Sequence, residues 1–460
     1  MTIKRQAIID IGSNAIRVAV YDSEKIGASV IYQDKFRTNF VEIINSTNYD
    51  THHSFYNIIQ YCLNIFKKFN VIQYKCVATA SFRSGNNYAQ FVQFLNQKYN
   101  FVIDVLSGED EARLTAAGVI LCFEKTSGII ADLGAGSLEL IRVCDNNITG
   151  LISLELGSRA LKSLRGVPIE NIDQHTIDTF NIGNIENVYL VGGGFRYLGK
   201  NYANNTRYPL KNLHALEISD VNLMRYINKV QQEKSDSKIL TDHHAIKIVT
   251  ALSQNFRPQK FIISNYGLQE GARLEILSHK EKNKDIILER CRRITYFNDA
   301  MTPHIDIYVN FIIPYTINSD IDIKKLIAIA MMFVASNVLD MPTKSMRLPQ
   351  MILTMDIPLT HRQRLMLSTI VCIAFQGDIS TYLANIIKVV LPKDDYDNAT
   401  IIGQLFYIIN KIDGYGYCGG PSFQIKDHKQ LEIEVRSNLP YGVWRDVQTA
   451  LQSIEKLCPR

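Results

Sequence analysis

The chain has 460 residues, of which 46% are hydrophobic and 21% charged, and its formal net charge is +5. This length predicts two or three domains with substantial cores, and the composition is ordinary for a globular protein. The charge excess is too small to favour a nucleic-acid polymer as partner. The 8 cysteines are scattered without a CxxC pair, which predicts reduced thiols and a cytoplasmic protein.

We expect no membrane partner. The longest apolar run begins at Leu326, and it is well short of the roughly 18 residues that a transmembrane helix needs. Near the N-terminus, Asp10 interrupts the first apolar run after a few residues. That interruption argues against a signal peptide.

The first informative pattern is residues 7–22, which read AIIDIGSNAIRVAVYD. An apolar run ends in Asp10, the loop Gly12-Ser13-Asn14 follows, and apolar residues then alternate. Period-two alternation on both sides of such a loop predicts strand, tight turn, strand. A turn of exposed N–H groups can bind an anion, and a carboxylate at the strand end can hold a divalent cation beside it.

The next segments predict an alternation of helices and strands. Residues 54–69 have helical apolar spacing, and residues 74–79 predict a strand that runs into a polar turn over 80–87, before a helix over 88–99. Arg83 lies at the end of this strand, where α/β folds place ligand-binding groups, and its guanidinium suits phosphate. Taken alone, Arg83 is better explained as a surface arginine paired with a carboxylate.

A strand over 101–106 precedes a second helix with an acidic start. Ser107 and Asp110 have capping-box spacing, which predicts a helix from here to about Phe123. Its first turn contains Glu109, Asp110 and Glu111. These acids are explained equally well as partners of the helix dipole or as the source of a general base whose pKa is raised by crowding.

The pattern of the first hairpin recurs at residues 128–144, which read GIIADLGAGSLELIRVC. One such loop alone would be an ordinary glycine-rich hairpin, but two copies favour a duplicated phosphate-binding fold with a nucleotide or polyphosphate cleft. A strand over 151–156 follows, and another over 188–191 runs into three glycines, 192–194. Because a helix is expected next, its N-terminal N–H groups would lie near an anion.

From about Lys280 the sequence becomes mostly helical, with long apolar-periodic segments at 324–339 and 365–375 and a small strand set near 431–435. His243, His244 and His304 lack metal-ligand spacing and are expected to be surface or core residues. The basic residues of this region are interpreted as a solvated helix face, with a groove for a long anion as the alternative. They are Arg290, Arg292, Arg293, Lys344, Arg347, Arg362 and Arg364.

Short motifs in a fixed order resemble the exopolyphosphatase/guanosine pentaphosphate phosphatase (Ppx/GppA) family over about the first 275 residues. They are DIGSN at 10–14, TASFR at 79–83, SGEDEAR at 107–113, DLGAGSLE at 132–139, LGSRAL at 156–161, VGGGFR at 191–196 and YGLQEG at 266–271. The resemblance implies an α/β fold with a duplicated ribonuclease-H-like (actin/sugar-kinase/Hsp70-like) core in lobes 1–123 and 124–280. It also implies a C-terminal, mostly α-helical domain over 281–460.

The resemblance implies a role for each matching residue. Glu111 would activate the attacking water and Arg83 would assist catalysis, while Asp132 and Glu139 would hold Mg²⁺. The expected phosphate-binding residues are Gly12, Ser13, Asn14, Gly134, Ala135, Gly136, Ser137 and Gly193. Phosphoanhydride hydrolysis needs a positioned water, a metal and preorganised N–H donors, so the implied roles agree with the chemistry of the loops.

The function implied is Mg²⁺-dependent release of terminal phosphates from inorganic polyphosphate or guanosine pentaphosphate, by a monomer or a homodimer. Ala135 and Leu138 depart from the family pattern, which has glycine and threonine there. If position 135 required a positive φ or a close approach of the phosphate, Ala135 would cost about 1 kcal/mol or displace the phosphate. A weakly active or inactive polyphosphate or alarmone sensor is therefore the alternative, and a sugar kinase or ATPase is a third.

Overall fold

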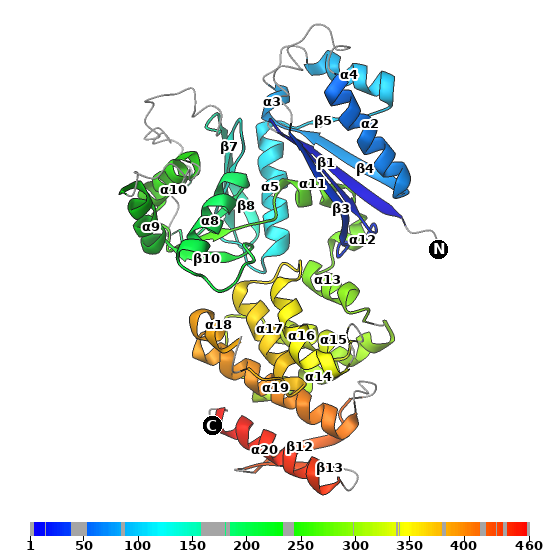
Figure 1. Cartoon of the computed structure of the whole chain (residues 1–460), viewed down its shortest axis with the longest axis vertical. Coiled ribbons are helices and arrows are strands. Elements are labelled where there is room, and N and C mark those ends of the chain that lie inside the picture. The colour runs from blue at the N-terminus through cyan, green and yellow to red at the C-terminus, as the bar shows by residue number, and fades with distance from the viewer. Residues whose placement is uncertain are drawn as a thin grey trace. The chain divides into compact units, whose positions relative to one another are not determined.

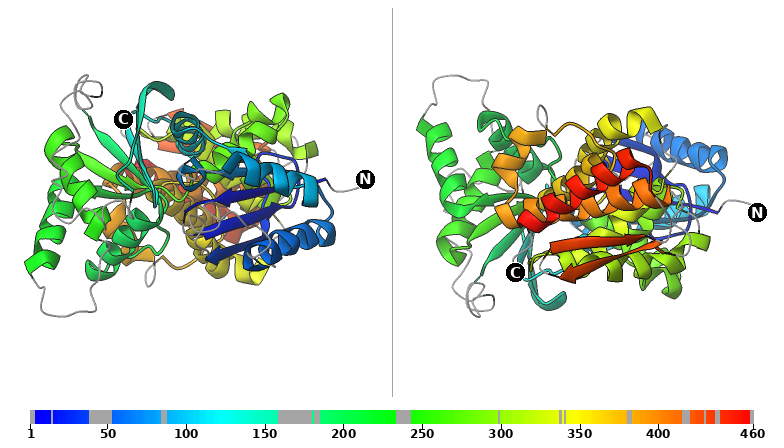
Figure 2. Two further views of the ribbon diagram at one scale, coloured as in Figure 1. Left: turned by 90° about the horizontal axis from the view of Figure 1, so that it is seen from above. Right: turned by 90° about the horizontal axis from the view of Figure 1, so that it is seen from below.

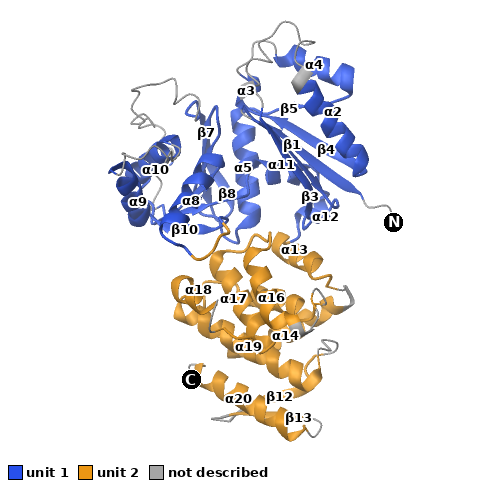
Figure 3. Ribbon diagram, in the orientation of Figure 1, with its two compact units in different colours: residues 1–208, 213–284 blue, residues 209–212, 285–460 orange. Residues whose placement is uncertain are grey.

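The computed structural model describes residues 4–13, 15–37, 53–83, 88–157, 180, 185–232, 243–297, 299–336, 339, 341–379, 383–414, 420–428, 430–435 and 439–457. The chain divides into two compact units, coloured in Figure 3: unit 1 is residues 1–208 with 213–284, and unit 2 is residues 209–212 with 285–460. Among the described residues, no helix is long and apolar enough to cross a bilayer.

The first sheet of unit 1 has five strands in the order β3-β2-β1-β4-β5 (Figure 1). The first three strands pair antiparallel and the last three parallel. Central strand β1 is buried on both faces, which is why it reads as a continuous apolar run. The strands are β1 (Arg5–Ile11), β2 (Ala15–Tyr21), β3 (Val30–Arg37), β4 (Val71–Ala78) and β5 (Asp104–Val105); the helices nearby in the chain are α2 (His53–Lys68), α3 (Ala80–Arg83) and α4 (Tyr88–Tyr99).

The second sheet of unit 1 has six strands in the order β10-β11-β9-β6-β7-β8. It repeats the plan of the first sheet. Strands β6, β7 and β8 form an antiparallel meander, and β9 then pairs parallel with β6. Its elements are β6 (Gly128–Leu133), β7 (Leu138–Cys144), β8 (Asn147–Leu154), β9 (Asn187–Val191), α8 (Gly193–Asn205), β10 (Leu216–Ser219), α9 (Asp220–Gln232), α10 (His243–Phe256) and β11 (Lys260–Ile263).

Two helices, α5 (Gly108–Cys122) and α11 (Leu268–Ile276), pack against each other and each covers a sheet (Figure 1). Apolar residues of α5 join the core cluster of the second sheet, while Ala272 of α11 joins that of the first. Glycine lets the two helices approach: a Cβ on Gly271 would lie 1.8 Å from the Leu114 carbonyl oxygen. The helix that begins with the acidic turn is thus fixed between the two sheets.

The end of unit 1 is bonded back to its beginning. The Gln6 side-chain amide donates to the Ile276 carbonyl (3.1 Å), and the Ile26 backbone N–H donates to Glu281 Oε2 (3.1 Å). Arg273 donates to the Ile26 carbonyl (3.0 Å). Glu281 belongs to the short helix α12 (His279–Lys282). The last residues of unit 1 are therefore hydrogen-bonded to β1 and to the loop at Ile26.

Unit 2 is a helical bundle with one hairpin, and its core cluster contains residues of unit 2 alone. The view from below in Figure 2 shows the hairpin beside the last helix, with which it is in contact. The elements are α13 (Ile286–Ile294), the 3₁₀ helix η3 (Asp299–His304), α14 (Ile305–Ile312), the 3₁₀ helix η4 (Ile313–Tyr315), α15 (Ile323–Val334), α16 (Met341–Thr354), α17 (His361–Ala374), α18 (Leu383–Val390), α19 (Lys393–Asp413), β12 (Phe423–His428), β13 (Gln430–Val435) and α20 (Tyr441–Leu457).

Two central arginines of this region bond within unit 2. Arg362 pairs with Asp320 and Asp395, each at 2.7 Å. Arg364 is fully buried and donates to backbone carbonyls. Both guanidinium groups therefore have their hydrogen-bond partners within unit 2, which argues against the alternative of a basic groove.

Most of the predicted elements are confirmed, including both hairpins and the helix capped by Ser107. Two local predictions are wrong. Residues 80–83 form the single turn α3, because Phe82 is fully buried, and not the start of a polar turn. The strand expected over 101–106 is reduced to β5, because Val102 is 57% exposed and only two residues pair with β4. The lobe boundary at residue 123 stays a prediction.

Candidate functional site

The two glycine loops share one backbone hydrogen bond. In the first, the Gly12 N–H donates to the Ala15 carbonyl at 3.0 Å, and in the second the Gly134 N–H donates to the Ser137 carbonyl at 3.0 Å. In both hairpins an aspartate lies two residues before this glycine, at the end of an apolar strand. The duplication expected from the sequence is therefore present in the structure.

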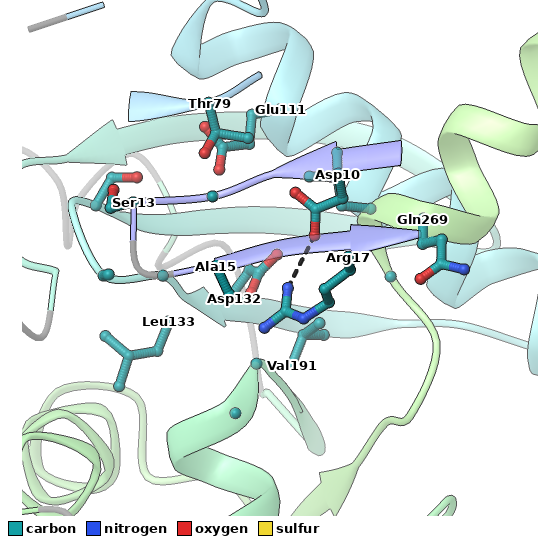
Figure 4. A pocket seen from close by; sticks show the side chains of 18 of the residues that line it. Asp10, Ser13, Ala15, Arg17, Thr79, Glu111, Asp132, Leu133, Val191 and Gln269 are labelled. Carbon is teal, nitrogen blue, oxygen red and sulfur yellow. Dashed lines mark hydrogen bonds and ion pairs between the residues drawn. The ribbon is translucent and has the colours of Figure 1, made fainter. Parts of the chain in front are cut away.

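Both loops line one cavity of about 350 Å³ in unit 1 (Figure 4). The predicted site residues that line it are Gly12, Ser13, Glu111, Asp132, Gly134, Ala135, Gly136, Ser137 and Gly193. Arg83 and Glu139 are not among the lining residues, but each lies against one of them. Asn14 and residues 158–161 of the LGSRAL motif are outside the described residues.

Glu111 is the acid of the first turn of α5 that faces the cavity. The Ser107 hydroxyl accepts a hydrogen bond from the Asp110 N–H at 3.0 Å, which caps the helix and fixes its first turn. Glu111 is 6% exposed, whereas Glu109 and Asp110 are exposed. Of the three acids in this turn, Glu109 and Asp110 are therefore surface residues and only Glu111 is buried.

Arg83 pairs with this buried carboxylate. Its Nη1 donates to Glu111 Oε2 at 2.9 Å and to the Leu106 carbonyl at 2.8 Å. Burial raises the pKa of Glu111 well above its usual range, the charge of Glu139 adds to the rise, and Arg83 opposes it. A carboxylate with a raised pKa is a stronger base, which suits the removal of a proton from water.

Asp132 and Glu139 are directly opposite each other on β6 and β7. Asp132 Oδ2 accepts from the Thr115 hydroxyl at 2.8 Å, and Glu139 Oε1 accepts from the Ser153 hydroxyl at 2.9 Å. Burial raises the pKa of Asp132. Burial, then the charge of Asp132, raises the pKa of Glu139 to about 7.

These two acids fit a magnesium ion. The fully buried Oε2 of Glu139 has no hydrogen-bond partner among the described residues, so one oxygen is left for a ligand. Within the described ranges no group of three or more metal-ligating side chains occurs. Mg²⁺ in phosphate sites takes one or two carboxylates and completes its shell with waters and substrate phosphate, so a pair is sufficient.

The glycines of the VGGGFR motif have different tasks. Gly192 has a φ of 108°, and a Cβ there would lie 2.5 Å from the Leu133 carbonyl oxygen, so this position requires glycine. At Gly193 a Cβ would meet no atom within 4 Å. The turn brings the N-terminus of α8 to the cavity, where free N–H groups favour an anion.

One of the two conditions under which Ala135 would be unfavourable, a positive φ, is not met. Ala135 lines the cavity but is not among the described residues with positive φ. Crowding in this loop comes from its neighbours, since a Cβ on Gly157 would lie 2.2 Å from the Gly136 carbonyl carbon. An alanine is therefore compatible with the backbone of the second loop.

The three cationic residues of the cavity lining were missed from the sequence: Arg17, Lys35 and Arg196. Arg17 donates to Asp10 Oδ2 at 2.8 Å. A charged residue inside the apolar alternation of β2 was a readable signal for Arg17, and so was the position of Arg196 after three glycines. Lys35 has no local signal, because only the strand pairing brings it to the cavity.

Comparisons with known proteins identify the family and the fold. The model of the Ppx/GppA phosphatase family matches residues 19–280. The crystal structure of the Aquifex aeolicus Ppx/GppA family member has 19% identity, covers 62% of this chain and 100% of that chain, and has a TM-score of 0.51. An exopolyphosphatase from Cytophaga hutchinsonii has 18% identity, covers 58% and 96%, and has a TM-score of 0.48.

A curated relative matches only in part. It is the bifunctional 3-dehydroquinate synthase/phosphatase of Fusobacterium nucleatum, 27% identical over 170 residues, which are 33% of this chain and 25% of the relative. The chain thus spans a quarter of the length of that relative.

The fold class expected from the motifs is confirmed: two mixed sheets with helices form an actin-like ATPase fold, followed by a helical region. The matched region includes more than half of the chain and contains the second loop, Glu111 and Arg83. The chain therefore belongs to the Ppx/GppA phosphatase family.

Proposed function

We propose that this chain is a Mg²⁺-dependent exopolyphosphatase that hydrolyses the terminal phosphoanhydride bond of inorganic polyphosphate, with guanosine pentaphosphate as a second substrate. The observation that supports it best is Glu111, a buried carboxylate with a raised pKa in a cavity lined by two glycine loops. Family membership supports the phosphatase class, and the exopolyphosphatase from Cytophaga hutchinsonii supports the choice of substrate.

In the proposed reaction, a Glu111 carboxylate oxygen accepts a proton from water. The water oxygen then bonds to the terminal phosphorus while the bridging P–O bond breaks and its electron pair leaves on the shortened chain. Arg83 holds the Glu111 carboxylate in place. The N–H groups of Gly12 and Gly134 already donate to carbonyls within their own loops. Other backbone N–H groups of the two loops bind the non-bridging oxygens as charge develops.

Asp132 and Glu139 are the residues that would hold Mg²⁺. When bound, the ion would neutralise negative charge on the phosphate oxygens. The Thr115 and Ser153 hydroxyls fix the orientation of the two carboxylates, which is the usual task of groups behind a metal site.

The test is orthophosphate release with Mg²⁺ from long-chain polyphosphate and, in parallel, from guanosine pentaphosphate. We expect Glu111→Gln to lower the rate by about 100-fold or more, because it removes the general base. Glu109→Gln, on the exposed side of the same turn, is the matched control and should retain the wild-type rate. Full activity of Glu111→Gln would refute the mechanism.

The same assay separates the alternatives. Tight binding of polyphosphate without release would identify a sensor, although the strain at Ala135 that suggested this alternative is not present. Phosphoryl transfer from ATP to a small acceptor would identify a kinase. Neither outcome is compatible with the proposed hydrolase.

A further inference from the structure

Thr79 is a cavity residue to which the proposed reaction gives no task. It is the first residue of the TASFR motif and directly follows β4. It lines the cavity and is only 6% exposed, yet its hydroxyl makes no hydrogen bond with any described residue. Buried polar groups are almost always hydrogen-bonded, so such a hydroxyl in a cavity lining indicates a water or a ligand as its partner.

The backbone of Thr79 is fixed on both sides. Its N–H donates to the carbonyl of Ile11, the residue before the first glycine loop, at 3.3 Å. Its carbonyl accepts from the Phe82 N–H at 2.9 Å, and the Phe82 ring is fully buried. Because a β-branched side chain also has few rotamers, the place of the Thr79 hydroxyl is set by the fold.

The segment around Thr79 is also bonded to the segment that carries Glu111. The Leu106 N–H donates to the Ala78 carbonyl at 2.9 Å, next to Thr79 in the chain. On the other side, Arg83 Nη1 donates to the Leu106 carbonyl at 2.8 Å and to Glu111 Oε2 at 2.9 Å. These bonds agree with Figure 4, where Thr79 and Glu111 lie at the same end of the cavity.

A general base alone does not orient the water that it activates. One O–H of the water donates to the carboxylate, and the molecule can still turn about that hydrogen bond. In-line attack requires an oxygen lone pair that points at the terminal phosphorus. A second acceptor for the other O–H would remove this rotation, and a threonine hydroxyl oxygen can accept such a bond.

We propose that Thr79 is this second contact and positions the attacking water. Its Oγ1 accepts a hydrogen bond from one O–H of the water, while the other O–H gives its proton to Glu111. The bonds that form and break are those of the proposed reaction, and Thr79 keeps its own proton. This inference rests on the proposed function, because it takes Glu111 as the base.

The test measures orthophosphate release from tripolyphosphate with Mg²⁺ by Thr79→Val, which loses the hydroxyl but keeps the branched shape. We expect kcat to fall about tenfold or more with KM within about twofold, because the lost contact is to water and not to the substrate. Thr79→Ala should show the same loss, and Thr79→Ser should restore most of kcat. Thr149→Val, at an exposed position of β8, is the matched control and should equal wild type.

A double-variant cycle distinguishes this role from a structural one. Two groups that act on the same water are not additive, so Thr79→Val should lower the residual rate of Glu111→Gln by no more than about twofold. An undiminished further loss would refute the shared water.

The same assays separate this inference from the proposed function. If Glu111→Gln keeps the wild-type rate, the proposed mechanism fails and the role of Thr79 fails with it. If Glu111→Gln loses activity as expected but Thr79→Val keeps the wild-type kcat, only the role of Thr79 is refuted. A rise in KM without a change in kcat would likewise refute it, since the hydroxyl would then bind the substrate.

Discussion

At Glu111, burial favours the protonated carboxyl and Arg83 favours the carboxylate. Replacing Arg83 by alanine removes the opposing charge, so the pKa of Glu111 rises further and less of it is a base at neutral pH. We expect the acidic limb of the pH–kcat/KM profile to move up by about one pH unit or more. Arg83→Lys should restore part of this shift, and an unmoved limb in Arg83→Ala would contradict the pairing.

Glu139 makes stability depend on pH. Its pKa in the folded protein is raised to about 7 from an ordinary value near 4.5, so the folded state binds the proton more tightly than the unfolded state. Stability is therefore lost as pH rises from about 4.5 through about 7, by an amount on the order of 3 kcal/mol.

The variant Glu139→Gln has no charge to bury. In EDTA, we expect it to unfold at higher denaturant concentration than wild type at pH 8, with a smaller difference at pH 5. Urea unfolding at both pH values measures this. A destabilised variant at pH 8 would show that the Glu139 carboxylate is stabilised by its neighbours.

At the scale of elements, the α5–α11 contact depends on glycine. A methyl group on Gly271 would overlap the Leu114 carbonyl of α5, so Gly271→Ala must push the helices apart. We expect the free energy of unfolding to fall by about 2–4 kcal/mol, as in overpacked cores. We also expect a lower kcat, because Glu111 moves with α5. Gly442→Ala, where a Cβ meets nothing within 4 Å, is the control, and equal stability of the two variants would contradict the contact.

The elements also show which features were readable from sequence. Both hairpins and helix α5 were predicted because their signals are local: alternation, a glycine loop and a capping serine. The turn α3 was missed, since only the buried environment of Phe82 makes that residue part of a core. For the site, Glu111 could be proposed from sequence. Only the packing of α5 shows that Glu111 is buried while Glu109 and Asp110 are exposed.

Arg17 and Arg196 had signals in the sequence, but the sequence did not show that they and Lys35 line the same cavity. Lys35 reaches the cavity through pairing of β3 with β2, and Arg196 through the turn that Gly192 allows. The backbone conformation at Ala135 could not be predicted either. A motif shows which residue is unusual, but it does not show which φ the loop adopts.

At the scale of the whole molecule, each core cluster of described residues belongs to a single unit. We expect calorimetry to show two transitions. Leu367→Ala, at a fully buried position of unit 2, should cost about 2–5 kcal/mol and lower only one of them. Tripolyphosphate with Mg²⁺ should raise the other, since its proposed cavity lies in unit 1.

A single transition that moves as a whole in the Leu367→Ala variant would show that the units unfold together. A ligand effect on the transition that Leu367→Ala lowers would place binding in unit 2. Either result would contradict the independence of the two cores.

Three hydrogen bonds that join the two ends of unit 1 have a consequence for synthesis on the ribosome. Arg273 donates to the Ile26 carbonyl, the Ile26 N–H donates to Glu281, and Gln6 donates to the Ile276 carbonyl. They join residues about 250 positions apart, so unit 1 has contacts of very long sequence separation. The first sheet emerges early, whereas α11, which packs against it, and Glu281 are the last parts of unit 1 to be translated. During that interval the face of β1 that α11 will cover is exposed, which makes the nascent chain a natural client for chaperones.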